Sequence, residues 1–183
     1  MPHLRLFVPE EWLREDFLQA TGFDARKLLD RLVQAVAKLQ MENPAIEARR
    51  QALRASDPNR IVTEEEARLN DHGNPIAPEM VPMINLSNLK HAIVPLHYAH
   101  VGGDSSKWFL HVTFAAGNDT PGRTAAVRRR AAKILGDEID QFVGGLPGLA
   151  SVTVHVQDLD RDRGYSTTAE RKKAREQAKA LGT

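Results

Sequence analysis

Apolar and polar side chains alternate directly after the first two residues of the chain. In residues 3–8, Leu4, Leu6 and Val8 are each separated by one polar or aromatic residue. A period of two residues is typical of a β-strand that buries one of its faces. The pattern therefore predicts a strand almost at the amino terminus.

A helical period follows after a mixed stretch that ends near Gly22. Asp24 is a residue type that favours the N-cap position. Behind it, apolar residues recur three and four positions apart, at Leu28, Leu29, Leu32, Val33, Val36 and Leu39. This spacing predicts an amphipathic helix whose apolar stripe lies on a sheet.

The periodicity weakens between residues 41 and 83, where charges are dense and prolines recur at positions 44, 58, 75, 78 and 82. We expect an inserted arm or lid over 41–83. Residues 45–54 favour a short helix within it, and Thr63 with Glu66 has the spacing of a capping box.

Two further strands and a second helix are predicted beyond the arm. Residues 89–101 read as an extended segment that reaches a turn at Gly102 and Gly103, and residues 107–116 follow as a second strand. Pro95 favours an edge or bulged position. Thr120 followed by Pro121 suits the start of a helix that ends at Gly144 and Gly145.

Alternation returns over residues 149–156, which predicts a last strand, and residues 158–183 become strongly charged. We interpret this tail as a surface helix or as an arm on a neighbouring chain. The order of elements implies an α+β fold in one domain over 1–183, with a mixed four-stranded sheet and two helices on one face. Apolar residues on the other face would stay wet in a monomer, so we expect an oligomer.

Composition narrows the range of functions. The chain has 183 residues, no cysteine and a formal net charge of +1. A cysteine nucleophile, a disulfide framework and a thiolate metal site are therefore excluded. The balance of charge gives no general attraction to nucleic acid, and no apolar run approaches the length that spans a bilayer. We expect a cytoplasmic protein with no nucleic-acid or membrane partner.

Pro2 is the residue with the most distinctive chemistry. Its small side chain permits removal of Met1, and the product carries a secondary amine at its terminus. Free α-amino groups titrate near about 7.7–8.0, and desolvation lowers that value. At the start of a strand, this nitrogen would be a fixed general base. If Met1 stays, the nitrogen is an amide without useful basicity. Met-Pro starts are common, so this interpretation depends on context.

That context comes from an ordered set of segments, namely MPHLRL at the start, residues 89–114 with the GG turn and KWFLHVTF, the helix opening at Thr120, and SVTVHV. Together they resemble the 5-carboxymethyl-2-hydroxymuconate isomerases, a branch of the tautomerase superfamily, over roughly two-thirds of the chain. The resemblance implies two pseudo-symmetric β-α-β units and a homotrimer. It also implies an amino-terminal proline that acts as general base, no cofactor and no metal.

The resemblance implies a small carboxylated substrate, an enol, dienol or 2-oxo acid, held by cationic side chains. Here the sequence departs from the family, because Leu89 and Thr120 stand where the family places arginines. Lys90 and His91 next to the first position and Arg123 near the second are the substitutes that we expect to bind the substrate. Thr120 itself would offer backbone N–H groups to an anion.

Other interpretations stay open. Pro2 as an acid would serve dehalogenation or decarboxylation, which members of this superfamily perform. Alternatively, the protein is a non-catalytic trimer that binds a partner through its arm or tail. A metal site formed by His91, His97, His100 and His111 is a further interpretation, but their spacing matches no recognised ligand pattern. Arg5 either approaches the site or reaches solvent.

Overall fold

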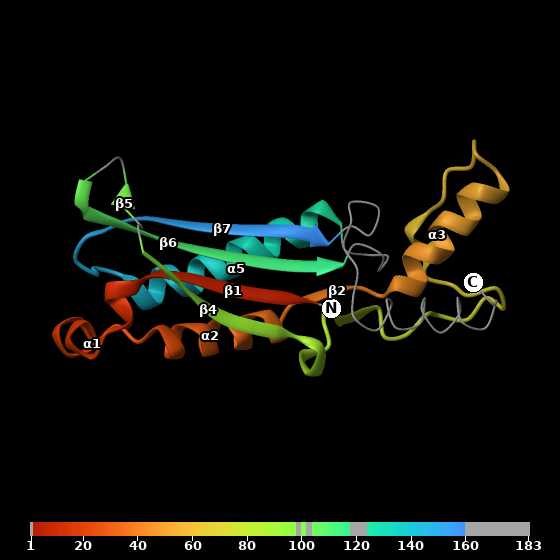
Figure 1. The fold of residues 1–183 in the computed structure, drawn as a ribbon. Helices are drawn as coiled ribbons and strands as arrows, with labels where there is room; N and C mark the ends of the chain where they lie inside the picture. Colours follow the sequence, from red (N-terminus) through yellow and green to blue (C-terminus); the bar gives the residue numbers. More distant parts are fainter. Residues whose placement is uncertain (1, 98–99, 102–103, 118–123, 160–183) are drawn as a thin grey trace, which may run out of the picture.

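The computed structural model describes residues 2–97, 100–101, 104–117 and 124–159, and Figure 1 shows their arrangement. Met1, the predicted turn at Gly102 and Gly103, Thr120, Arg123 and the tail from residue 160 lie outside the described residues. Within the described part, no helix is long and apolar enough to cross a membrane.

The sheet is built around the first strand, as alternation predicted. Strand β1 (His3–Pro9) lies between β4 (Lys90–Leu96), which runs parallel to it, and β6 (Asp104–Gly117), which runs antiparallel. Strand β7 (Leu149–Leu159) pairs in parallel with β6 on the side away from β1. The short strand β5 (His100–Val101) pairs with the start of β6 and is an addition to the four strands that the sequence predicted.

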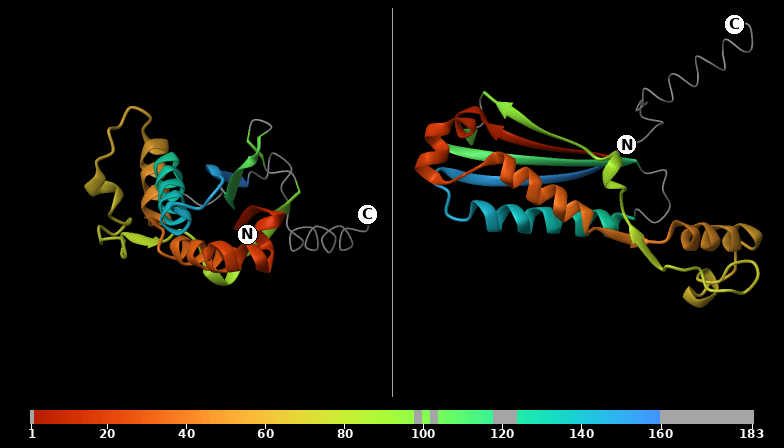
Figure 2. Two further views of the ribbon diagram at one scale, coloured as in Figure 1. Left: turned by 90° about the vertical axis from the view of Figure 1, so that its left-hand side faces the viewer. Right: turned by 90° about the horizontal axis from the view of Figure 1, so that it is seen from below.

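Two helices cover one face of this sheet, which confirms the predicted α+β class (Figure 2). Helix α2 (Ala25–Ala37) begins where Asp24 accepts hydrogen bonds from the N–H groups of Arg26 at 2.9 Å and Lys27 at 3.3 Å. Helix α5 (Ala125–Val143) lies beside α2. The largest fully buried aliphatic side chains between helices and sheet include Leu4, Leu6, Val8, Leu28, Leu32, Leu110, Leu135 and Ile139. No polar or charged side chain is buried among the described residues.

The start of the second helix differs from the prediction. Helix α5 begins at Ala125, and its N-cap is Thr124, whose hydroxyl accepts a hydrogen bond from the N–H of Val127 at 3.4 Å. Both Thr120 and Thr124 can cap a helix, and only the path of the chain decides between them. Arg123 therefore precedes the helix instead of lying one turn inside it. The predicted end is confirmed, because Gly144 is the C-cap.

A segment that showed no clear period links β1 to α2. It forms the 3-10 helix η1 (Glu10–Leu13) and helix α1 (Glu15–Thr21). The Trp12 ring in η1 is 2% exposed and stacks on Phe17, with centroids 5.1 Å apart. The Trp12 ring also lies 6.3 Å from the ring of Trp108 in β6, a distant contact that local periodicity does not reveal.

The second face of the sheet, here called the open face, is not covered by a helix of the described chain (Figure 2). The registers place Arg5 of β1 beside Thr113 of β6, and Thr113 beside His155 of β7. Apolar side chains such as Phe7 are interspersed. The open face therefore mixes polar with apolar side chains, and its apolar members such as Phe7 have no covering helix in the described chain.

The chain between α2 and β4 leaves the sheet. It contains β2 (Gln40–Glu42), α3 (Pro44–Ser56), α4 (Glu64–Ala67) and β3 (Met80–Pro82), and then the 3-10 helix η2 (Leu86–Asn88) leads into β4. We call residues 40–82 the arm and the other described residues the body. The arm extends beyond the end of the sheet at which β1 begins (Figure 1). The predicted helix over 45–54 and the capping box of Thr63 with Glu66 are confirmed.

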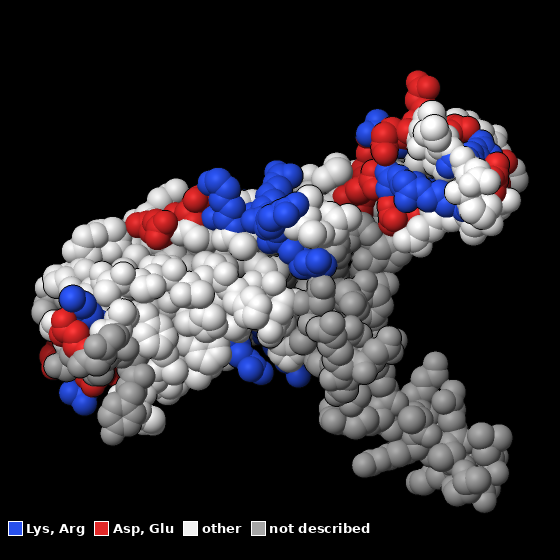
Figure 3. Space-filling model, turned by 90° about the horizontal axis from the view of Figure 1, so that it is seen from above, with Lys and Arg blue, Asp and Glu red and all other residues white. Residues whose placement is uncertain are grey.

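Ion pairs dominate the arm. The Arg50 guanidinium, in a side chain only 13% exposed, binds Glu42 at 3.1 Å and Glu64 at 2.9 Å and also pairs with Glu47. The hydrogen bond to Glu42, and next those to Glu47 and Glu64, raise the pKa of Arg50 above its usual value. Figure 3 shows both signs of charge crowded together on the arm, beside a broad uncharged surface of the body.

Candidate active site

Pro2 lies directly before the strand at the middle of the sheet. It is buried, and its carbonyl oxygen accepts a hydrogen bond of 3.0 Å from the N–H of Lys90 at the start of β4. Because β1 is bonded to a neighbouring strand on each side, the backbone that follows Pro2 is fixed. The residue therefore has a rigid, dry position, which proton transfer by a terminal amine requires.

Cationic side chains gather on the open face next to Pro2. His3 pairs with Lys90 across the β1–β4 register, and Arg5 lies two residues further along β1 on the same face. Burial lowers the pKa of His3, and the charges of Arg5 and Lys90 lower it further. This end of the open face thus carries an electropositive field, which suits a carboxylate. The side chain of Arg5, which the sequence left undecided, is exposed on this face.

The two expected substrate-binding residues of β4 point to different faces. Lys90 pairs with His3 on the open face, whereas His91 pairs with Leu4, whose side chain faces the helices. Successive side chains of a strand alternate between its faces, so the two cannot grip one small ligand from the same face. Pro2 is two residues before Leu4, and alternation therefore puts it on the side of His91. Both residues lie close to Pro2 in the β1–β4 pairing, but their side chains are on opposite faces of the sheet.

The remaining expected residues, Thr120 and Arg123, lie outside the described residues. The chain on either side of their segment is described. Strand β6 passes Ala115, which pairs with His3, and ends at Gly117, while the chain returns at Thr124 to cap α5.

Of the candidate metal-binding histidines, His97 and His111 lie in different places in the described structure. His97 lies beyond β4, where its Nδ1 is 2.5 Å from a carboxylate oxygen of Glu10. His111 instead faces the open side, with its ring 5.3 Å from Phe7. Burial, and next the neighbouring His155, lower the pKa of His111. Among the described residues no group of three or more histidine, aspartate or glutamate side chains is arranged to hold a metal ion.

Sequence reasoning did not find the association of His111 with His155. Each histidine occupies a polar position in a strand with alternating polarity, His111 in HVTF and His155 in SVTVHV. This alternation was the signal in the sequence that both side chains point away from the helices. The register that places Thr113 opposite His155 and His111 opposite Thr153 brings them onto neighbouring strands. That register depends on long-range pairing and is not written in either segment alone.

A cavity of about 520 Å³ lies where the arm joins the body. Its lining includes Ala37 at the end of α2, Pro82 at the end of β3, and Leu86 in η2. The chain then runs from η2 into Lys90 and the bond to Pro2. The base of the arm and the candidate active site therefore share the connection over residues 86–90.

Comparison with solved structures shows the fold. The chain resembles a 5-carboxymethyl-2-hydroxymuconate delta-isomerase with a TM-score of 0.54 and 15% identity, covering 92% of this chain and 87% of that one. A 5-carboxymethyl-2-hydroxymuconate isomerase from Deinococcus radiodurans R1 aligns with a TM-score of 0.47 and 12% identity, covering 91% of this chain and 88% of that one. No protein-family model and no curated protein sequence matches the chain.

The fold is therefore of the tautomerase type, which confirms the expected α+β architecture with two helices on one face of a mixed sheet. An identity of 15% carries no information about the reaction. Any function must be argued from the residues of this chain.

Proposed function

We propose that this protein is an isomerase of the tautomerase type, which moves a proton within a small carboxylated enol, dienol or 2-oxo acid. The single observation that supports it best is the position of Pro2, buried at the head of the central strand and bonded through its carbonyl to Lys90. After removal of Met1, the Pro2 nitrogen is a secondary amine, and burial beside Lys90 and Arg5 favours its neutral form.

The proposed reaction needs only one proton carrier. The neutral Pro2 nitrogen takes a proton from the enol hydroxyl or from a carbon of the substrate, and the resulting ammonium returns a proton to another carbon. No atom is gained or lost overall. The Lys90 ammonium pairs with the substrate carboxylate and stabilises negative charge on the neighbouring oxygen. Arg5 adds positive charge near the same carboxylate. We also propose that His91, Thr120 and Arg123 contact the substrate.

The proposal extends to assembly and domain organisation. We propose a single domain over 1–183, with 41–83 as an arm or lid and 158–183 as a charged tail. In a homotrimer the open face would turn inward, away from bulk water. This arrangement is supported by the half-buried Phe7 and His111, which lie on a sheet face that has no covering helix in the described chain. Light scattering on the full chain tests it, since three chain masses are expected.

The test of the reaction is ketonisation of phenylenolpyruvate, followed by the loss of its enol absorbance. Intact mass first establishes that Met1 is absent. We expect Pro2→Ala to lower kcat by a factor of about 10² or more, the scale of general acid–base catalysis. Lys90→Met should raise KM, while Lys27→Met on the outer side of α2 serves as the control and changes neither constant. Equal activity of Pro2→Ala in a folded protein would remove Pro2 as the base.

A further inference from the structure

A second cavity lies toward the end of the sheet that is opposite Pro2. It has a volume of about 580 Å³ and is enclosed by the η1–α1 segment, the start of α2 and the edge strand β4. Ile93 is the lining residue nearest to Pro2 along the β1–β4 pairing, and it lies opposite Leu6, four residues beyond Pro2. At about 3.3 Å for each strand residue, that separation is about 13 Å. The cavity is therefore independent of the candidate active site, and we call it the distal cleft.

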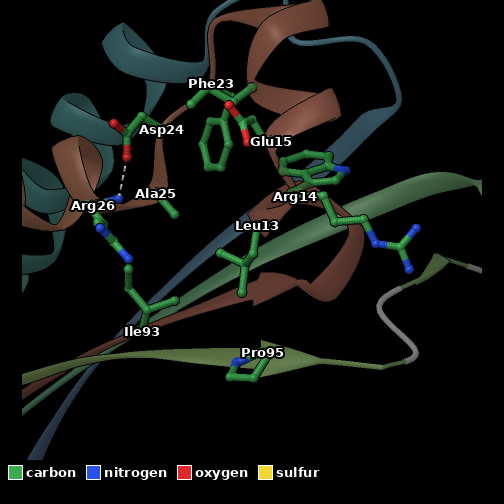
Figure 4. A pocket seen from close by; sticks show the side chains of 11 residues that line it. Leu13, Arg14, Glu15, Phe23, Asp24, Ala25, Arg26, Ile93 and Pro95 are labelled. Carbon is green, nitrogen blue, oxygen red and sulfur yellow. Dashed lines mark hydrogen bonds between the residues drawn. The ribbon is translucent and has the colours of Figure 1, made fainter.

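The walls of the distal cleft are apolar and rigid. Figure 4 shows Leu13 in the middle of the view, with Phe23 above it and Ile93 and Pro95 of β4 below it. Phe23 is 3% exposed and meets the Trp12 ring edge-on at 5.3 Å, which fixes its orientation. By contrast, Leu13 remains 41% exposed. A cleft of this size with a preformed aromatic wall can receive an apolar group without having to order its own side chains.

The charges at the rim favour an anion. Asp24 faces the cleft, but one of its carboxylate oxygens already accepts the N–H groups of Arg26 and Lys27. The Arg26 guanidinium has no ion pair or side-chain hydrogen bond within the part of the chain that the structure describes, and Arg26 and Ile93 both line the cleft (Figure 4). Arg14 points away from the cleft, and Glu15 lies on the far wall near Phe23. Arg26 is thus the cation available to a ligand on the apolar wall.

We propose that the distal cleft binds a small amphipathic anion, with its apolar body against Leu13, Phe23 and Ile93 and its carboxylate or sulfonate on Arg26. The ligand class follows from the combination of an aromatic wall and one available guanidinium, which pairs strongly with planar anionic groups. This site is separate from the proposed reaction at Pro2, and its occupancy does not require that reaction.

Binding of 8-anilinonaphthalene-1-sulfonate to the folded full-length protein tests the proposal, with N-phenyl-1-naphthylamine as the neutral probe that has the same aromatic body. We expect saturable binding of the anion at one site per chain. Arg26→Gln should raise the Kd of the anionic probe about 5–10-fold and leave the neutral probe unchanged, since about 1.4 kcal/mol corresponds to tenfold. Lys27→Gln, on the next residue of the same helix and outside the lining, is the matched control and should change neither.

A second pair of variants tests the apolar wall. Leu13→Ala should weaken the binding of both probes about threefold. Leu86 is the matched control, because it is 43% exposed and Leu13 is 41% exposed. Leu86→Ala should leave the binding of both probes unchanged. Glu15→Gln should leave anion binding unchanged or tighten it. Near-UV circular dichroism verifies that each variant keeps its packing, because partly folded states also bind this dye.

Three results would overturn the proposal: absence of saturable binding, equal losses in Arg26→Gln and Lys27→Gln, or a loss in Leu86→Ala that exceeds the loss in Leu13→Ala. Weaker binding of the anionic probe after Glu15→Gln would also contradict the proposal, because removal of a carboxylate from the cleft cannot weaken an anion held by Arg26. Ketonisation activity is measured separately, so failure of the distal cleft leaves the role of Pro2 standing, and the reverse also holds.

Discussion

The body and the arm are stabilised by different forces, although they belong to one continuous chain. The body buries Leu4, Leu32, Phe114 and similar side chains completely, and it buries no polar side chain among the described residues. The arm buries few side chains, among them Ile46, Leu53 and Ala67, and relies on ion pairs around Arg50. Figure 3 makes the contrast visible as mixed charge on the arm.

This difference means that the body and the arm respond differently to solution conditions. Apolar burial gives the sheet a cooperative core that positions Pro2 and the distal cleft. Ion pairs near the surface are weakened by salt and by loss of one partner, so the arm responds to conditions that leave the body unchanged. Trp12 and Trp108, the two tryptophans of the chain, both lie in the body. Tryptophan fluorescence therefore reports the body alone, and hydrogen exchange of residues 44–67 reports the arm.

The largest effect on stability is expected when a buried leucine is replaced by alanine, once in the body and once in the arm. Leu32→Ala in α2, at a fully buried position, should lower the free energy of unfolding of the body by about 2–5 kcal/mol. Denaturant titration followed by tryptophan fluorescence measures it. Leu53→Ala in α3, at 9% exposure, should raise hydrogen exchange over 44–67 and leave the fluorescence midpoint in place. Equal shifts of that midpoint would show that the two regions unfold as one unit.

Removal of the central cation of the arm should come next in size. Arg50→Gln leaves Glu42, Glu47 and Glu64 facing one another without their shared partner. We expect a local destabilisation of about 2–3 kcal/mol, because hydrogen bonds to charged groups are lost and like charges remain. Hydrogen exchange of α3 measures this effect. Arg54→Gln on the same helix, which is exposed, serves as the control.

A smaller local effect is expected at the capping box. Thr63→Ala removes the hydroxyl that accepts the Glu66 N–H at 3.3 Å. Loss of an N-cap side chain costs about 1 kcal/mol, and here the cost should be confined to exchange of the amides of α4. Thr63→Ser keeps the hydroxyl and should restore protection. A change in the tryptophan midpoint would contradict the independence of the two regions.

The body and the arm should lose stability at different pH values when the solution is acidified. Burial lowers the pKa of His3 and His111 below 6.5, so the unfolded body binds more protons and its stability falls as pH drops below 6.5. The hydrogen bond from the Thr63 N–H, and then that from Arg60, lowers the pKa of Glu66 from 4.5 to about 2. The stability that Glu66 contributes is therefore complete above pH 4.5 and is lost between pH 4.5 and 2.

We expect this acid effect to be the smallest of the four. As pH is lowered, the denaturation midpoint measured by fluorescence should begin to fall below pH 6.5. Hydrogen exchange of residues 44–67 should increase only between pH 4.5 and 2. Glu66→Gln should remove the lower response, and His111→Gln should reduce the upper one. A response of the arm near pH 6, with the body unchanged, would reverse the assignment.

Much of the architecture was predictable because it follows from local patterns. Alternation around Leu4 and Leu6 predicted β1, and the stripe behind Asp24 predicted α2, since each depends on neighbours within a few residues. The start of α5 was wrong by four residues, because Thr120 and Thr124 have equal capping chemistry and local sequence does not decide between them. The mixed segment that forms η1 and α1 has no clear period, and its buried Trp12 contacts the distant Trp108, which local patterns do not reveal.

The sequence by itself determined the order of strands and helices, the apolar face of each, and the presence of Pro2 ahead of the first strand. The tertiary structure alone decided that Lys90 and His91 face opposite sides, that Arg50 joins three carboxylates, and that Arg26 overlooks an apolar cleft. The physical reason is range. Backbone conformation and side-chain periodicity are set by residues close in the chain, whereas strand register, ion-pair geometry and cavity shape arise only when distant segments pack together.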